Sequence, residues 1–244
     1  MQKTKFLIAI YLMACTSHFY SQEFQSSDPE SEGFSEERLK RIAPVMQKYI
    51  DQDLTPGVLT AIMRNGKIVY LETQGFMDVK EEKPLQEDAI FRIASMTKPI
   101  TSLCIFQLIE QNLISLETNL QDIDKRFSDV KIIKKTDNKI NYIKPKSNIK
   151  IKHLLNHTSG YGYQFLNPEI KYLVDNKLLQ DLKDDGADFL DAPILFEPGE
   201  RWNYGIGIDI LGYIIEKISK KKLNDYMKEN LFNKLGMNNT TFHL

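Results

Sequence analysis

The sequence has few features of a disulfide-stapled, membrane-spanning or nucleic-acid-binding protein. Only two cysteines occur among its 244 residues, Cys15 and Cys104. Cys15 falls in a predicted N-terminal leader, so only Cys104 would certainly remain after processing, and no internal disulfide is expected. No run of about 20 apolar residues occurs, which argues against a transmembrane helix. The formal net charge of −1 supplies no positive field for nucleic acid, so we expect no nucleic-acid partner.

Motifs of several common enzyme classes are also missing from the sequence. His153 and His157 have the spacing of a zinc-protease helix, but Leu154 stands where that motif requires glutamate, and no third ligand is evident. The glycines of the 205–212 segment do not form the GxGxxG of a dinucleotide site. No GxSxG of an α/β-hydrolase occurs either. We therefore expect neither a metal nor an organic cofactor.

The composition is that of a globular protein, with 42% hydrophobic and 27% charged residues. We expect one domain over residues 30–244, with inserted helices, rather than two independent units. Two lysine-rich or acidic stretches, 131–152 and 181–191, are interpreted as solvated connections. A helix is predicted over 35–52, capped by Ser35, and its core-facing residues should be Leu39, Ile42, Val45, Met46 and Tyr49. Helices are also predicted over the terminal segments 209–219 and 223–231.

The N-terminal segment has the pattern of a targeting signal. Lys3 and Lys5 precede an apolar run over 6–14 that is too short to span a bilayer. We expect residues 1–21 to be a signal peptide that directs export to the periplasm or beyond. A lipoprotein signal is the alternative, because LMAC ends at Cys15, and only lipidation there would give the chain a membrane partner.

One β-hairpin is predicted from strict alternation. Residues 58–64 and 67–73 alternate apolar and polar side chains, and Asn65-Gly66 between them suits a type I′ turn. An isolated hairpin is marginal in water, because three or more strands are usually needed for stability.

The segment FRIASMTKP (91–99) places Ser95 and Lys98 three residues apart, which is one face of a helix. A lysine held against a serine in a partly dry pocket can lose its proton and then act as the base that a free serine lacks. The spacing alone is not diagnostic, because a lysine also lies three residues after Ser128, Ser147 and Ser219.

The context distinguishes Ser95 from the other three serines. Lys98 is followed by apolar residues at mostly helical spacing, which predicts a buried helix: Ile100, Leu103, Cys104, Ile105, Leu108 and Ile109. Pro99 is tolerated only in the first turn, so the helix should begin near Ser95. Free N–H groups and the helix dipole would then favour negative charge at Ser95. The alternative is an ordinary N-cap serine beside a surface lysine.

Four segments resemble the serine beta-lactamase and penicillin-binding superfamily, and most of all its class C-like hydrolases and esterases. They are GVLTAIMRNGKIVYLETQGFMD (57–78), FRIASMTKP, HLLNHTSGY (153–161) and FEPGERWNYGIGIDILGYIIEKIS (196–219). The likeness runs from about residue 34 to the last residue. It implies an α/β fold in which an antiparallel sheet is flanked by helices, with a mostly helical region inserted between the first and second motifs.

The resemblance also implies roles for individual residues. Ser95 matches the acylated nucleophile and Lys98 the lysine of the first motif, while Tyr204 matches the tyrosine of the second. The Tyr204 phenol would face Ser95 and share the general-base work. His157 matches a structural histidine, and Cys104 is interpreted as an inert core residue. The implied function is that of a secreted serine hydrolase acting on small acyl compounds.

The chain departs from the family pattern at two points. The beta-lactamase form of the second motif has an asparagine that helps to bind the lactam amide, and Ile206 stands there instead. Losing such a hydrogen bond costs about 1 kcal/mol net, so simple esters are better candidate substrates than beta-lactams. Penicillin-binding D-alanyl carboxypeptidase and beta-lactamase activities remain alternatives.

The third motif of the family, Lys-Thr-Gly or a His-x-Gly variant, does not occur in the sequence as given. In the family that motif lies on a strand that gives one N–H to the oxyanion hole, and losing one such donor costs ~10²–10³ in rate. We therefore expect an incomplete sheet and a domain that lacks its C-terminal part. An inactive fragment, or a binding module of the same fold, is the alternative to an active enzyme.

Overall fold

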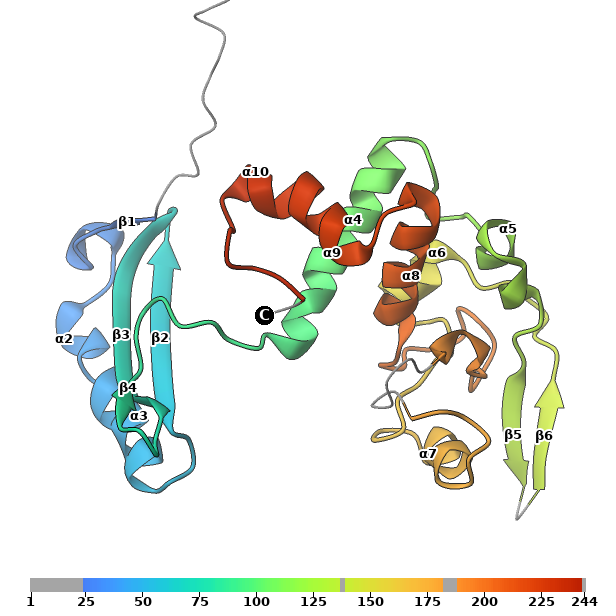
Figure 1. The fold of residues 1–244 in the computed structure, drawn as a ribbon, viewed down its shortest axis with the longest axis horizontal. Helices are drawn as coiled ribbons and strands as arrows, with labels where there is room; N and C mark the ends of the chain where they lie inside the picture. The colour runs from blue at the N-terminus through green and yellow to red at the C-terminus, as the bar shows by residue number, and fades with distance from the viewer. Residues whose placement is uncertain (1–23, 137–138, 182–187, 243–244) are drawn as a thin grey trace, which may run out of the picture. The chain divides into compact units, whose positions relative to one another are not determined.

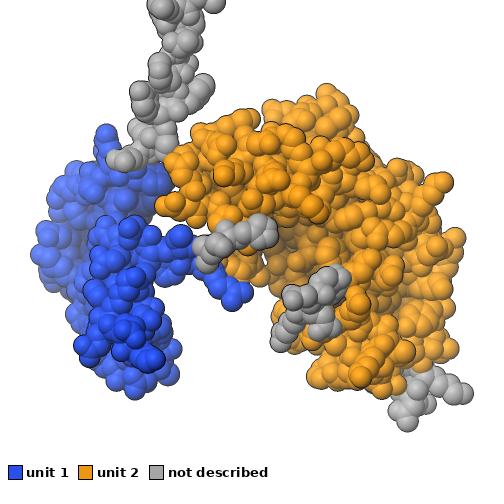
Figure 2. Space-filling view, viewed as in Figure 1, with its two compact units in different colours: residues 1–92 blue, residues 93–244 orange. Residues whose placement is uncertain are grey.

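The computed structural model describes residues 24–136, 139–181 and 188–242. The predicted signal peptide with Cys15, and most of the acidic 181–191 stretch, lie outside the described residues. The chain forms two compact units, Met1–Arg92 and Ile93–Leu244 (Figure 2). The single domain expected over 30–244 stays a prediction. Among the described residues, no helix is long and apolar enough to cross a membrane.

The first unit is built around the predicted hairpin. Strands β2 (Gly57–Arg64) and β3 (Lys67–Asp78) pair antiparallel (Figure 1), and β3 is longer than the alternation indicated. Asn65 and Gly66 have φ values of 54° and 75°, as both central residues of a type I′ turn require. The hairpin prediction is therefore confirmed.

Two short strands complete this sheet on β3. β1 (Gln25–Ser26) lies parallel to β3, and β4 (Lys83–Pro84) pairs antiparallel with its far end. In the described part of the unit, the strand order is β1–β3–β2, with β4 also on β3. The sheet is thus small, mixed and partial.

The helices of the first unit differ from the single helix expected over 35–52. After a 3₁₀ turn η1 (Glu30–Glu32), the chain forms two helices, α2 (Glu36–Leu39) and α3 (Ile42–Asp51). Ser35 caps α2 as predicted, since its Oγ accepts the Arg38 N–H. Helix α3 has no fully buried residue, and Val45 and Tyr49, both expected in the core, are about half exposed (45% and 49%).

In the second unit, helix α4 (Thr97–Glu110) packs against α8 (Gly207–Ser219), which also contacts the short helix α6 (Ile151–Leu155) (Figure 1). Isoleucine and leucine side chains of α8 provide much of this core, and Gly207 and Gly212 of the same helix are buried. Only one face of α4 is buried, and its buried residues are Thr101, Cys104, Ile105 and Leu108. Leu103, expected in the core, is 46% exposed.

The chain after α8 follows the prediction with one modification. Helix α9 (Leu223–Met227) continues through a π turn, η5 (Lys228–Phe232), into α10 (Asn233–Leu235). Tyr226, Met227 and Phe232 of this segment are buried in the core of the unit.

The region between α4 and α8 is only partly helical. It contains α5 (Leu120–Ile123), η3 (Lys125–Ser128), α6, α7 (Pro168–Asp175) and η4 (Phe189–Asp191), together with a second hairpin, β5 (Ile132–Thr136) and β6 (Lys139–Ile143). The hairpin falls where a solvated loop was predicted, so that prediction is wrong. Ile132 and Ile133 are buried, and Ile133 N–H donates to the carbonyl of the distant Ile194 at 2.8 Å.

Candidate active site

Ser95 and Lys98 lie where the chain turns into helix α4. Ser95 belongs to a 3₁₀ turn η2 (Ala94–Met96), and Lys98 is in the first turn of the α-helix that follows. The preceding Ala94 has a left-handed φ of 43°, which is strained for a residue other than glycine. The Lys98 ammonium donates a hydrogen bond to Ser95 Oγ at 3.4 Å. The predicted helix start and the Ser95–Lys98 contact are confirmed.

Tyr204 reaches the same serine from the loop before α8. Its hydroxyl oxygen lies 2.9 Å from Ser95 Oγ, within hydrogen-bond distance. The loop is fixed on both sides of Tyr204, because the Asn203 N–H donates to the His157 carbonyl at 2.8 Å and Gly205 packs against the Tyr161 backbone. A Cβ at Gly205 would lie 2.3 Å from the Tyr161 oxygen, so only glycine allows this approach.

The turn formed by His157-Thr158-Ser159-Gly160 packs against Tyr204 through the His157 ring. The His157 ring lies 4.8 Å from the Tyr204 ring and 6.2 Å from the Trp202 ring, measured between centroids. Burial, followed by the nearby positive charge of Lys98, lowers the pKa of His157. A half-buried imidazole packed against the Tyr204 ring is compatible with the structural role that the family resemblance implies for His157.

The pKa of Tyr204 results from opposing influences. Partial burial raises it, but hydrogen bonds with Lys98 and Ser95 and the positive charge of Lys98 lower it. The net effect is a pKa below the ordinary value of 10.0. A phenolate next to an ammonium and a serine hydroxyl can accept the proton of that hydroxyl.

A second tyrosine and an aspartate belong to this cluster, and sequence reasoning missed both. Tyr163 is buried, and its ring lies 5.5 Å from Lys98 Nζ and 5.5 Å from the Tyr204 ring. Its hydroxyl donates to Asp209 Oδ2 at 2.8 Å. The position of Tyr163 just after the HTSG turn was the available signal, because that turn packs against Tyr204.

Ile206, two residues after Tyr204, is buried. It is 3% exposed and belongs to the hydrophobic core of the unit. The position therefore offers no donor or acceptor, as the sequence indicated, and it contributes packing instead.

The other three Ser-x-x-Lys pairs lack this arrangement. Ser128 ends η3, Ser147 is exposed, and Ser219 ends α8. Among the described residues, none of these serines hydrogen-bonds the lysine three positions later. Context, rather than the tetrapeptide, therefore distinguishes Ser95.

Cys104 and His153 have structural surroundings. The Cys104 thiol is free and fully buried in the core, and burial raises its pKa to about 11. The predicted core position of Cys104 is confirmed. His153 is buried, and its Nδ1 accepts the Lys150 N–H at 3.2 Å. Among the described residues, no group of three His, Cys, Asp or Glu side chains is arranged to hold a metal ion.

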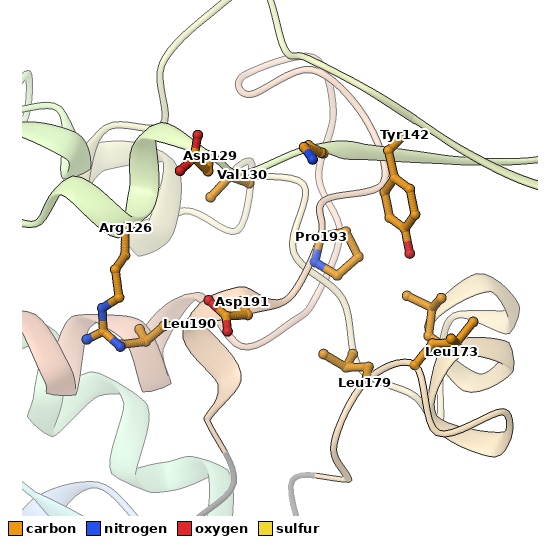
Figure 3. Close-up of a pocket in the computed structure, with 11 residues that line it drawn as sticks. Arg126, Asp129, Val130, Tyr142, Leu173, Leu179, Leu190, Asp191 and Pro193 are labelled. Atoms are coloured by element: carbon orange, nitrogen blue, oxygen red, sulfur yellow. The ribbon is translucent and has the colours of Figure 1, made fainter.

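A separate hollow of about 260 Å³ lies beside β5 and α7. In Figure 3, Tyr142 from β6 and Leu173 from α7 point toward each other across it, with Pro193 beside them. Its lining contains none of the residues around Ser95, so a substrate that reacts with Ser95 would not bind in this hollow.

The chain belongs to the Beta-lactamase family, whose model matches residues 42–244. It is 32% identical over 198 residues to ML-236A carboxylate methylbutanoyltransferase mlcH of Penicillium citrinum, covering 78% of this chain and 47% of that protein. Esterase EstB of Burkholderia gladioli is 28% identical over 214 residues, covering 83% of this chain and 51% of the esterase.

The fold is similar to that of solved family structures. Unliganded simvastatin synthase (LovD) of Aspergillus terreus has a TM-score of 0.72 and 26% identity, covering 83% of this chain and 54% of that one. The predicted family and its α/β beta-lactamase-like fold class are therefore confirmed. The chain spans about half the length of the curated relatives that it matches.

Proposed function

We propose that this chain is a secreted serine hydrolase that acts on acyl compounds through an acyl-enzyme at Ser95. The observation that carries the proposal is the joint approach of Tyr204 and Lys98 to Ser95 Oγ, at 2.9 Å and 3.4 Å. Membership of a family with esterase and acyltransferase relatives supports acyl chemistry in general.

In the proposed mechanism, Tyr204 and Lys98 act as one general-base unit. The Tyr204 phenolate accepts the Ser95 proton while Ser95 Oγ forms a bond to the acyl carbonyl carbon. The leaving group departs with the proton held by Tyr204, and the acyl-enzyme remains. Water then gives a proton to Tyr204 and attacks the acyl carbon, and that proton returns to Ser95 Oγ as the acid is released. The charge of Lys98 stabilises the phenolate at both stages.

We propose small esters as substrates, in preference to beta-lactams. Ile206 offers no side-chain hydrogen bond to a lactam amide, and EstB is an esterase. An alcohol in place of water would convert hydrolysis into acyl transfer, which is the activity in the name of mlcH. No metal or organic cofactor is needed in this scheme.

Export through residues 1–21 is part of the proposal, with lipidation at Cys15 as the alternative. The mass of the mature protein recovered from the native host tests it. Loss of the leader supports secretion, a lipid-modified N-terminus at Cys15 supports anchoring, and an intact leader in the cytoplasm would contradict both.

The catalytic proposal is tested by hydrolysis of a p-nitrophenyl acyl ester and of a chromogenic beta-lactam. Ser95→Ala should abolish ester turnover, and Tyr204→Phe should reduce it by ~10²–10⁴. Ser128→Ala is the matched control, because it removes a serine of the same motif elsewhere in the unit. Equal turnover in wild type and Ser95→Ala would overturn the proposal, and a faster reaction with the beta-lactam would overturn the substrate preference.

A further inference from the structure

The Lys98 ammonium lies over two aromatic rings in addition to its hydrogen bond with Ser95. Its Nζ lies 4.9 Å from the centroid of the Tyr204 ring and 5.5 Å from that of the Tyr163 ring. Both distances are within the roughly 6 Å over which an ammonium is attracted to an aromatic face. Among the ion pairs of the described residues, none includes Lys98. The two rings and Ser95 therefore decide where its ammonium lies.

The Tyr163 ring is itself firmly anchored. Its hydroxyl donates to Asp209 at 2.8 Å, and its backbone N–H donates to Asn167 Oδ1 at 2.9 Å. Phe165 stacks on it with centroids 4.9 Å apart and planes 18° from parallel. A ring fixed on these sides gives a constant surface for the Lys98 ammonium.

The two tyrosines that contact Lys98 have opposite electrostatic surroundings. Burial, the charge of Asp209 and the hydrogen bond to Asp209 raise the pKa of Tyr163. The pKa of Tyr204 is lowered instead, by its hydrogen bonds with Lys98 and Ser95 against the effect of burial. When their surroundings shift the pKa values of two titratable groups in opposite directions, the two groups take different roles. Tyr163 stays a neutral phenol while Tyr204 is the group that ionises.

We propose that Tyr163, anchored by Asp209, is a positioning residue whose ring holds the Lys98 ammonium against Ser95 and Tyr204. The inference rests on the proposed function, because the position of Lys98 matters through the base that it supports. Tyr163 acts through Lys98 and takes no proton from Ser95. Asp209 has two effects, since it orients the Tyr163 hydroxyl and its negative charge raises the pKa of Tyr204.

The ionisation of Tyr204 reports the position of Lys98. The groups that face Tyr204 come from several elements: Ser95 and Lys98 at the start of α4, His157 and Tyr163 beside the HTSG turn, Trp202 in its own loop, and Asp209 on α8. Lys98 is the cation among them, so moving it away from Tyr204 should make the phenolate harder to form.

The first test compares Tyr163→Leu with Tyr163→Phe. Leucine removes the ring, and phenylalanine keeps the ring but removes the hydroxyl. Tyr163→Leu should slow labelling of Ser95 by a fluorophosphonate on the order of tenfold, as loss of a partly buried cation–π contact implies. The pH range over which the labelling rate of this variant rises (the limb of its pH–rate profile) should also move to higher pH. Tyr163→Phe keeps the ring but loses the bond to Asp209, so it should slow labelling less than Tyr163→Leu does. The control Tyr142→Leu, at an exposed tyrosine on β6, should match wild type.

The second test needs no activity. The difference in tyrosinate absorbance between a protein and its Tyr204→Phe version isolates the titration of Tyr204 among the 11 tyrosines. The midpoint should rise in Tyr163→Leu. It should fall in Asp209→Asn, because asparagine keeps an acceptor for Tyr163 but removes the negative charge.

The possible outcomes separate the two proposals. An unmoved midpoint in Tyr163→Leu, or equal effects of Tyr163→Leu and Tyr163→Phe, would overturn the positioning role while leaving Ser95 labelling in wild type intact. Absence of wild-type labelling would overturn the proposed function instead, and the absorbance titration would still show whether Tyr163 fixes Lys98 beside Tyr204.

Discussion

Tyr204 shows how a single side chain depends on its neighbours. A tyrosine in water remains protonated at neutral pH, with an ordinary pKa of 10.0. Here Lys98 and Ser95 counteract the effect of burial and lower that pKa. A base that must lose its proton before it acts becomes more effective as the pH rises through its pKa.

The reaction rate of Ser95 should therefore rise with pH, and the midpoint of this rising limb should lie below 10.0. Lys98→Met should move that limb to higher pH, because it removes the charge and the hydrogen bond that lower the pKa of Tyr204. The rate of fluorophosphonate labelling measured from pH 6 to pH 11 checks this. Lys131→Met, from another Ser-x-x-Lys pair, is the control and should leave the limb in place. A limb that is the same in Lys98→Met and wild type would contradict the electrostatic account.

Gly205 provides a second prediction at the residue scale. Alanine there would bring a Cβ within 2.3 Å of the Tyr161 carbonyl oxygen and 2.8 Å of Gly162 Cα, both backbone atoms that cannot turn aside. We expect Gly205→Ala to destabilise the fold by about 1–3 kcal/mol and to displace Tyr204, with loss of ester turnover.

Urea unfolding together with turnover checks the Gly205 prediction. Gly212→Ala is the matched control, because its nearest neighbour is the flexible end of Leu223 at 3.0 Å. That change should cost less than about 1 kcal/mol, since alanine also favours the helix. Full stability and turnover in Gly205→Ala would show that the backbone contact is not needed.

The three proposed catalytic residues were predictable from sequence because each lies in a local motif. Ser95, Lys98 and Tyr204 follow from spacing, from an adjoining apolar helix and from family resemblance. The Tyr163–Asp209 contact was not predictable, because nothing local pairs a tyrosine with an aspartate 46 positions away. Their contact exists only after the HTSG turn and α8 have packed together.

At the level of elements, the β2–β3 hairpin depends on a buried carboxylate beside its turn. Glu32 from η1 accepts hydrogen bonds from Lys67 at 2.7 Å, Asn65 at 2.9 Å and Ser27 at 3.1 Å. These bonds lower the pKa of Glu32 to about 2, in the order Lys67, Asn65, Ser27. Glu32 thereby connects the N-terminal segment to both sides of the type I′ turn.

Glu32 should make the first unit sensitive to acid. Its folded pKa of about 2 lies below the ordinary value of 4.5. The stabilisation is therefore fully present above pH 4.5 and is lost as the pH falls toward 2. Glu32→Gln should lower the melting temperature at pH 7. It should also reduce the fall in melting temperature between pH 4.5 and about pH 2.

Thermal melts followed by far-UV circular dichroism check the acid prediction. Glu117, which Lys150 and Lys152 hold at a pKa of about 2, leaves a residual slope in the variant. Glu87→Gln, at an exposed position after β4, is the control. An unchanged melting temperature and slope in Glu32→Gln would contradict the role assigned to this carboxylate.

Elements with a clear local pattern were predicted correctly, and those that depend on distant partners were not. The β2–β3 hairpin has strict alternation and an Asn-Gly turn, and α8 has regular apolar spacing. The β5–β6 hairpin is rich in lysine, and its buried Ile133 bonds to Ile194, about 60 positions away. Likewise, the apolar spacing of α3 predicted a core-facing side, but α3 has no fully buried residue, and Val45 and Tyr49 are about half exposed.

At the scale of the whole molecule, family membership and site geometry lead to the same chemistry. The Beta-lactamase family model matches residues 42–244, and the second unit alone brings together Ser95, Lys98 and Tyr204. The fold class could be predicted from sequence because its motifs occur in family order. The division at Arg92 could not, because compactness arises from contacts that no local pattern records.

The central claim is that Ser95 is an activated nucleophile in this chain. The most direct measurement is the intact mass of the purified protein after treatment with a fluorophosphonate, with Ser95→Ala as control. The account predicts one covalent adduct on the wild-type chain and none on the variant. A folded wild-type chain that acquires no adduct, or an adduct that persists in Ser95→Ala, would contradict it.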